Sequence, residues 1–172
     1  LTRPAPGRLV EAMAQALPGI LADSTGDVLA FLPGQGEIRR VAARLEGHPG
    51  LAGVTVTPLY GDLAAEAQDQ AIRPRPDGGR KLVLATAIAQ TSLTIEGVRV
   101  VVDGGLSRVA RFDPGAGMTR LVTVPVSRAT ADQRRGRAGR LGPGLCWRLW
   151  SEADDRAPVS YTHLAGDSQM TL

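Results

Sequence analysis

The chain has 172 residues, of which 43% are hydrophobic and 22% are charged, and this balance excludes wholesale disorder and a fibrous repeat. No apolar stretch approaches the roughly 18 residues that cross a bilayer, and no signal peptide is recognisable, so we expect a soluble, cytoplasmic protein without a membrane partner. One cysteine, Cys146, and two distant histidines exclude an internal disulfide and a zinc site, so no metal ligands are predicted.

The net charge is only +3, but the basic residues are concentrated in one part of the chain. Residues 99–148 hold ten arginines and three aspartates, a net charge of +7, whereas the remainder carries −4. All basic residues but Lys81 are arginine, the side chain that binds phosphate through two parallel hydrogen bonds. A GC-rich genome would explain the preference for arginine over lysine. It does not explain the concentration of charge, which favours a phosphate-bearing partner.

The first part of the chain predicts helices alternating with strands. Apolar residues at helical spacing predict a helix over residues 8–22, with a kink or break at Pro18-Gly19. The short apolar run 28–32 ends at Pro33-Gly34 and predicts a buried strand. A second helix is predicted over residues 37–45, with apolar and arginine side chains on opposite faces.

The alternation continues through the middle of the chain, with Asp62 as the expected N-cap of the next helix. Continuous apolar runs there are typical of central parallel strands that are covered on both faces. Together with the helices between them, they predict an open α/β sheet. The predicted elements are strand 54–59, helix 63–72, strand 81–86, a short helix over 87–93 and strand 98–103.

A hairpin then interrupts the alternation. Residues 107–112 and 119–124 flank the turn sequence 113–117, Asp-Pro-Gly-Ala-Gly, which predicts two antiparallel strands. Ser127 is expected to cap a helix that runs to about Ala138.

Residues 144–150 predict a last strand, which carries both tryptophans of the chain. Trp147 and Trp150 are candidates for stacking against bases. Because alternating positions on a terminal strand usually pack against helices, we favour a place in the core for both.

The segment that begins at Gln133 is the sharpest chemical pattern. At about 100° per residue, Gln133, Arg137 and Arg140 fall on one side of a helix, whereas Arg134 and Arg135 point elsewhere. Two guanidiniums beside an amide can neutralise a transferring phosphoryl group and hold an attacking water. The alternative is a solvated basic face. The glycines of the segment argue against it, because they weaken a helix but let another surface approach the backbone.

These residues carry a resemblance to a known family. The chain over residues 28–150 resembles the second RecA-like lobe of DEAH-box ATP-dependent RNA helicases of superfamily 2, and in particular the bacterial HrpB type. Four segments carry the resemblance in the family's order: motif IV at 31–38, motif V at 85–97, the β-hairpin at 108–120 and motif VI, Q-R-x-G-R-A-G-R, at 133–140.

The resemblance implies a RecA-like, open, mostly parallel α/β sheet with helices on both faces and a β-hairpin insertion. Residues 1–26 would form an N-terminal helical segment of the lobe, and residues 27–152 the helicase C-terminal domain. Residues 153–172 depart from the family pattern, and we expect an irregular tail to which we assign no role.

The resemblance also implies roles in ATP hydrolysis. Arg137 and Arg140 would be arginine fingers, with Gln133 beside them, and Thr94 and Glu96 would lie near the nucleotide and its metal ion. Without the resemblance, Thr94 would be taken for a helix or loop cap and Glu96 for a surface carboxylate.

RNA contacts are implied for motif V and for the hairpin. Thr86 would touch the nucleic-acid backbone. Arg108 and Arg111 would lie on the hairpin, at the place where the two strands of a nucleic-acid duplex separate. A purely structural hairpin with solvated arginines is the alternative. Ala87 and Gln90 stand where the family commonly has Asn and Glu, so no roles are transferred to these two positions.

The sequence contains no G-x-x-x-x-G-K-[ST] phosphate loop and no Asp-Glu-x-His box. We therefore expect ATP and Mg²⁺ to be held mainly by a missing N-terminal RecA-like lobe of the same protein, and this chain alone to be inactive. The predicted function is the second motor lobe of an RNA helicase that acts on single-stranded or partly duplex RNA. Two alternatives stay open: a non-catalytic arginine-rich nucleic-acid-binding module, and a lobe of a superfamily 2 DNA helicase.

Overall fold

A computed structural model describes residues 7–91, 93–138, 142–150 and 170–171. Its main sheet contains β1 (Asp27–Phe31), β2 (Val54–Leu59), β3 (Arg80–Ala85), β4 (Val98–Asp103), β7 (Leu145–Arg148) and β8 (Met170–Thr171). These strands follow the order β2-β3-β1-β4-β7-β8, and every neighbouring pair is parallel. The predicted open parallel sheet is therefore confirmed.

The helices are α1 (Leu9–Ala22), α2 (Gln35–Leu45), α3 (Ala65–Ile72), α4 (Ile88–Thr91) and α5 (Arg128–Arg135), with a short 3-10 turn, η1 (Pro49–Leu51). They cover both faces of the sheet, as β1 illustrates. Val28 and Ala30 belong to a core shared with α1 and α2, whereas Leu29 and Phe31 belong to a second core on the other face, shared with α3 and α4. A strand buried on both faces must be apolar throughout, which is why its sequence shows no alternation.

The helix α1 continues through Pro18, so the expected break is absent. Proline cannot donate the hydrogen bond to the residue four positions earlier, and this weakens the helix. The helix nevertheless packs Met13 and Leu17 before the proline, and Ile20 and Leu21 after it, into one core. This packing on both sides keeps the two halves in one helix.

Asp62 is not the N-cap of α3, which corrects another expectation. The helix begins at Ala65, and its cap residue, Ala64, makes no side-chain capping bond. The side-chain amide of Gln68 instead donates to the carbonyls of Leu63 at 2.9 Å and Gly61 at 3.3 Å. A side chain of the helix itself thus stabilises the preceding turn, and the helix starts two residues later than predicted.

The prediction for α5 is right at its start and wrong at its end. Ser127 caps it, because its hydroxyl oxygen accepts from the N–H of Thr130 at 3.1 Å. The helix stops at Arg135, with Gly136 as its C-cap, rather than at Ala138. The next N–H groups, of Arg137 and Ala138, donate three residues back, at 3.0 and 3.1 Å, so the backbone tightens into turns.

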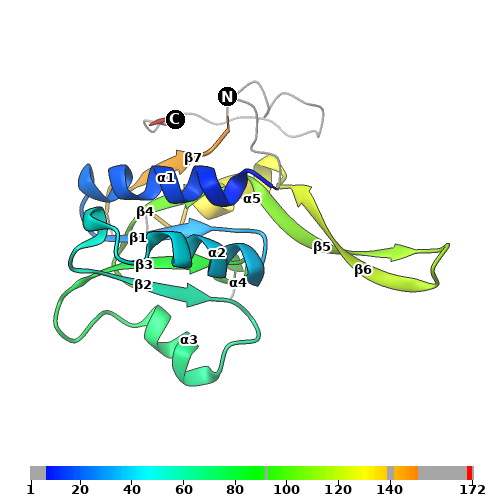
Figure 1. Cartoon of the computed structure of the whole chain (residues 1–172), viewed down its shortest axis with the longest axis horizontal. Coiled ribbons are helices and arrows are strands. Elements are labelled where there is room, and N and C mark those ends of the chain that lie inside the picture. The colour runs from blue at the N-terminus through cyan, green and yellow to red at the C-terminus, as the bar shows by residue number, and fades with distance from the viewer. Residues whose placement is uncertain (1–6, 92, 139–141, 151–169, 172) are drawn as a thin grey trace.

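The predicted hairpin is confirmed and forms a sheet of its own. Its strands are β5 (Leu106–Asp113) and β6 (Met118–Pro125), which are antiparallel. The carboxylate of Asp113 accepts from the N–H groups of Gly115 and Ala116 in the turn, at 3.0 and 3.3 Å. Figure 1 shows this ribbon extending well away from the main sheet.

Trp150 lies in the core, as favoured from the sequence, whereas Trp147 is partly buried. Trp150 is 1% exposed and clusters with Val126 and Ala131, while Trp147 packs against the first core. Gly105 makes room for this arrangement, because a Cβ there would lie 2.7 Å from the Trp150 ring.

Two residues of the tail, which form β8, pair with β7, so the tail is not irregular throughout. They add a partner to the open edge of the sheet, where β7 offers unpaired backbone groups. Residues 153–169 and 172 lie outside the described residues. No helix in the described ranges is long and apolar enough to span a membrane.

Candidate functional site

The candidate site lies where the central strands end. The strands β3 and β4 are parallel to β1 on either side of it, so their carboxyl ends meet at one edge of the sheet. Open α/β sheets bind their ligands at this edge. Thr86 and α4 follow β3 there, and Asp103 is the last residue of β4.

One residue of α4, Gln90, connects this edge to α5. Its side-chain Nε2 donates to Oε1 of Gln133 at 3.2 Å, and its Oε1 accepts from Nε of Arg134 at 3.1 Å. Its backbone carbonyl accepts from Nη2 of Arg137, whose Nη1 donates to the carbonyl of Leu93 at 3.0 Å. Gln133 and Arg137, predicted to lie together, are therefore both held against α4 and the residues after it.

Arg134 is the residue that sequence reasoning missed. Its guanidinium is fully buried and forms an ion pair of 2.7 Å with Asp103, whose side chain is also fully buried. The two terminal nitrogens lie 3.3 and 3.4 Å from the carbonyl of Leu106, and the guanidinium carbon lies 4.8 Å from the centre of the Phe31 ring. A carboxylate at the end of an otherwise apolar strand was the available signal, because a buried charge needs a partner.

Glu96 does not join the Gln90 contacts. Its side chain is exposed, and its backbone N–H donates to the carbonyl of Ile72, at the end of α3, at 3.4 Å. Burial lowers the pKa of Lys81, near the start of β3, and the negative charge of Glu96 partly offsets this effect. Glu96 thus lies toward the amino ends of the strands. Thr94, two residues earlier, is exposed as well.

Thr86 is half-buried directly after β3, and its backbone N–H donates to the carbonyl of Leu59 at 3.0 Å. This bond extends the pairing between β2 and β3 by one step. Thr86 therefore has a fixed backbone at the ligand-binding edge of the sheet.

The two hairpin arginines have different surroundings. Arg108, near the root, lies 3.3 Å from the carboxylate of Glu37 in the first turn of α2. Its guanidinium covers Gly34, where a Cβ would lie 2.8 Å from the guanidinium carbon. Arg111 is exposed farther along the ribbon and faces Arg120 in the strand register. Arg108 is therefore tied to the body of the protein, and Arg111 is presented on the ribbon.

Arg140, the other expected finger, lies outside the described residues. In the described ranges, no group of three or more His, Cys, Asp or Glu residues is placed to hold a metal ion. Burial and the charge of Asp103 raise the pKa of Cys146 from 9.0 to about 12, so this thiol stays protonated at neutral pH.

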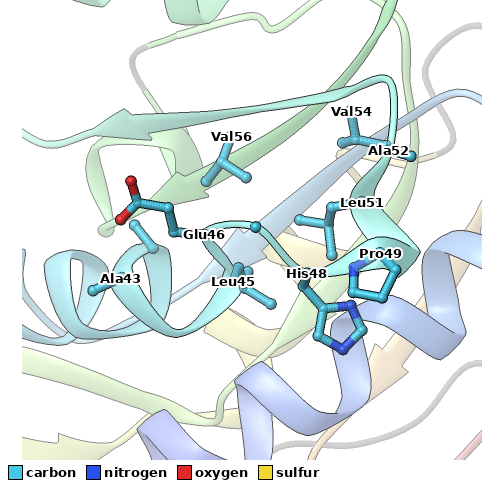
Figure 2. A pocket seen from close by; sticks show the side chains of 11 residues that line it. Ala43, Leu45, Glu46, His48, Pro49, Leu51, Ala52, Val54 and Val56 are labelled. Carbon is cyan, nitrogen blue, oxygen red and sulfur yellow. The ribbon is translucent and has the colours of Figure 1, made fainter.

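A groove of about 710 Å³ lies elsewhere, between the end of α2, η1 and β2 (Figure 2). It is close to Val54, the first residue of β2, and hence at the end of the sheet opposite to Gln90. Its lining is mainly apolar, with Glu46 and His48 as its polar side chains. These surroundings do not suit a phosphate group, so the groove is not part of the candidate site.

Comparisons with known proteins agree with this geometry. Residues 9–142 match the family described as "Helicase conserved C-terminal domain". The chain is 52% identical over 149 residues to the ATP-dependent RNA helicase HrpB of Escherichia coli, covering 87% of this chain and 18% of that protein. It is 45% identical over 138 residues to the pre-mRNA-splicing factor ATP-dependent RNA helicase prp22 of Schizosaccharomyces pombe, covering 77% and 12%.

The fold comparison gives the same result. The crystal structure of the E. coli DExH-box NTPase HrpB superposes with a TM-score of 0.84 at 48% identity, covering 95% of this chain and 20% of that one. The chain thus spans about a fifth or less of the relatives it matches. Since the family pattern extends over most of its length, the chain belongs to the helicase conserved C-terminal domain family, in its DEAH type.

Proposed function

We propose that the complete protein is an ATP-dependent RNA helicase and that this chain is its second motor lobe. The main support is that Gln133 and Arg137 are held side by side against α4, at the carboxyl edge of a parallel sheet. The relatives named as ATP-dependent RNA helicases add to this support. The cytoplasmic location expected from the sequence stays a prediction.

In this proposal, ATP is the substrate and is bound mainly by the other RecA-like lobe, to which we also assign Mg²⁺. Closure of the two lobes brings Arg137 to the γ-phosphate as an arginine finger, and Arg140 is proposed as the second. In this structure Arg137 donates to neutral backbone carbonyls. Exchanging these neutral acceptors for anionic phosphoryl oxygens strengthens each hydrogen bond, because both partners are then charged. This gain arises mainly in the transition state, where charge develops on those oxygens.

Gln133, Thr94 and Glu96 complete the proposed nucleotide side. Gln133 would contact the γ-phosphate or the attacking water. The exposed Thr94 and Glu96 are proposed, from the family resemblance alone, to contact the nucleotide or its metal ion from the loop after α4, although Glu96 lies toward the amino ends of the strands, away from Gln133.

RNA is proposed to run along the same edge and over the hairpin. Thr86 would contact its backbone, and Arg111 and Arg108 would bind phosphates without reading sequence. Because Arg108 already pairs with Glu37, a phosphate has to compete with a carboxylate for it. Arg111 should therefore carry more of the RNA affinity.

The test is ATP hydrolysis by the complete protein, measured without nucleic acid, with single-stranded RNA and with DNA of the same sequence. We expect turnover that RNA stimulates and DNA stimulates much less. Absence of turnover in a folded protein that binds RNA would support a non-catalytic binding module instead. Equal or stronger stimulation by DNA would point to a DNA helicase. The 172-residue chain alone serves as a control and should not hydrolyse ATP, because it has no phosphate loop.

A further inference from the structure

Gln90 contacts both the residues that are proposed to face the nucleotide and a buried residue of the interior. It is bonded to Gln133 and to Arg134 through its side chain, and to Arg137 through its carbonyl. The proposed function gives roles to Gln133 and Arg137 but none to Gln90.

The direction of each hydrogen bond is determined by Arg134. A guanidinium has donors only, so the atom of Gln90 that meets Nε of Arg134 must be the oxygen Oε1. The amide nitrogen of Gln90 then points to Gln133, which must present its own oxygen in return. Consequently Oε1 of Gln133 accepts one hydrogen bond from Gln90, and its Nε2 points away from Gln90 with its donors directed to a ligand.

These contacts start from Arg134, whose side chain is held rigidly. Arg134 is fully buried, and its guanidinium is held in its plane by Asp103 at 2.7 Å, by the carbonyl of Leu106 and by the ring of Phe31. Charge-assisted hydrogen bonds in a buried setting are strong and directional. The position of Nε, and hence of the Gln90 amide, is therefore fixed by the core of the lobe.

We propose that Gln90 is a positioning residue for ATP hydrolysis: anchored by Arg134, it holds Gln133 with its amide N–H groups toward the γ-phosphate and holds the base of Arg137 through its carbonyl. This inference rests on the proposed function, since it assumes that Gln133 and Arg137 face the phosphate. It also assigns Gln133 the role of a donor, through Nε2, to a phosphoryl oxygen.

The experiment uses the complete protein with saturating RNA. Gln90→Leu removes both side-chain bonds and should lower kcat for ATP about tenfold, with KM for ATP and the Kd for RNA within about twofold, because the loss falls on the transition state. Gln90→Glu still accepts from Arg134 but has no N–H to donate to Oε1 of Gln133. The Gln133 amide would then turn its oxygen toward the phosphate, so kcat should fall as it does in Gln90→Leu. If Gln90→Leu does not fold, Gln90→Asn replaces it, because a side chain one methylene shorter cannot reach both partners.

A double-mutant cycle separates positioning from general loosening. If Gln90 acts through Gln133, adding Gln90→Leu to Gln133→Ala should lower kcat by less than twofold further. Full additivity of the two losses, or wild-type kcat in Gln90→Leu, would overturn the inference. These outcomes are distinct from failure of the proposed function, in which the wild-type protein itself would show no RNA-stimulated turnover.

Discussion

Arg134 holds a positive charge in the interior of the protein, where a single mispairing is costly. Its ion pair with Asp103 joins α5 to the end of β4, and both side chains are fully buried. Such a pair contributes little net stability over an apolar substitute of the same size, but breaking it leaves a charge without a partner. The ion pair therefore determines how α5 sits against β4 more than it increases the free energy of unfolding.

Replacing one partner alone should be strongly destabilising. Arg134→Met should lower the free energy of unfolding by about 3–5 kcal/mol, because Asp103 is left buried and charged. Arg135→Met is the matched control and should change it by about 0.5 kcal/mol or less, since Arg135 lies at the surface. The measurement is urea unfolding of each variant, followed by circular dichroism.

Adding Asp103→Asn to Arg134→Met should recover part of the loss. The added substitution removes the orphaned charge and still leaves an oxygen to accept from the N–H of Gly105. If Arg134→Met were as stable as the Arg135 control, the buried pair would not be holding α5 against β4.

Part of the surroundings of Arg134 could be predicted from the sequence. The helical projection places Arg134 away from Gln133 and Arg137. In the structure its guanidinium does turn inward to Asp103, but Gln90 contacts all three side chains. Its partner Asp103 lies 31 residues away and becomes adjacent because the chain returns to the end of β4 after the hairpin. Contacts of this kind depend on register in three dimensions, which apolar periodicity does not encode.

At the scale of elements, the hairpin is a ribbon with two unlike faces. Phe112 and Leu121 are 65% and 69% exposed, and the strand register places them on the same face. Arg111 and Arg120 face each other on the opposite one. A turn signal between two short runs was enough to predict the ribbon, because hairpins are local structures.

The hairpin arginines should affect strand separation more than ATP hydrolysis. Replacing Arg108 and Arg111 by Ala in the complete protein should reduce unwinding of a partial RNA duplex while RNA-stimulated turnover stays within about twofold. The slope of log affinity for RNA against log salt should become shallower by roughly 0.7 for each phosphate that an arginine no longer neutralises. Unwinding and hydrolysis are measured on the same preparation.

Two single variants divide this effect between the arginines. Arg111→Ala should account for most of the loss in RNA affinity, because Arg108 is paired with Glu37. Parallel loss of hydrolysis and unwinding in the double variant would leave the hairpin as structural support, and undiminished unwinding would also contradict the prediction.

The end of α5 shows where local prediction fails. The sequence predicts a helix to about Ala138, and the structure turns at Gly136 instead. Glycine costs about 1 kcal/mol in a helix. Ala138 is buried against the second core, which the turn makes possible. The direction of the Arg137 side chain is therefore determined by a turn and not by a helix. Its proximity to Gln133 was nevertheless predicted correctly.

In the whole molecule, the positive charge is concentrated in the stretch of chain that also contains Gln133, Arg134 and Arg137. Residues 99–148, with a net charge of +7, include β4, the hairpin, α5 and β7. In Figure 1 the hairpin and α5 lie at the same end of the lobe. The parallel sheet could be predicted from its apolar strands, whereas the strand order, and with it the meeting of α4 and α5, could not.

The proposed function requires this lobe to complete an ATPase site by supplying arginine fingers to a nucleotide that is held by the other lobe. The most direct measurement is kcat for RNA-stimulated ATP hydrolysis by the complete protein carrying Arg137→Ala, beside Arg135→Ala as a neighbouring arginine that points elsewhere. We expect a loss in kcat on the order of 10³-fold for Arg137→Ala and a kcat close to wild type for Arg135→Ala, with RNA binding retained in both. Equal weakening of RNA binding by the two variants, with turnover per bound enzyme intact, would contradict this expectation and make the arginine segment a plain basic face.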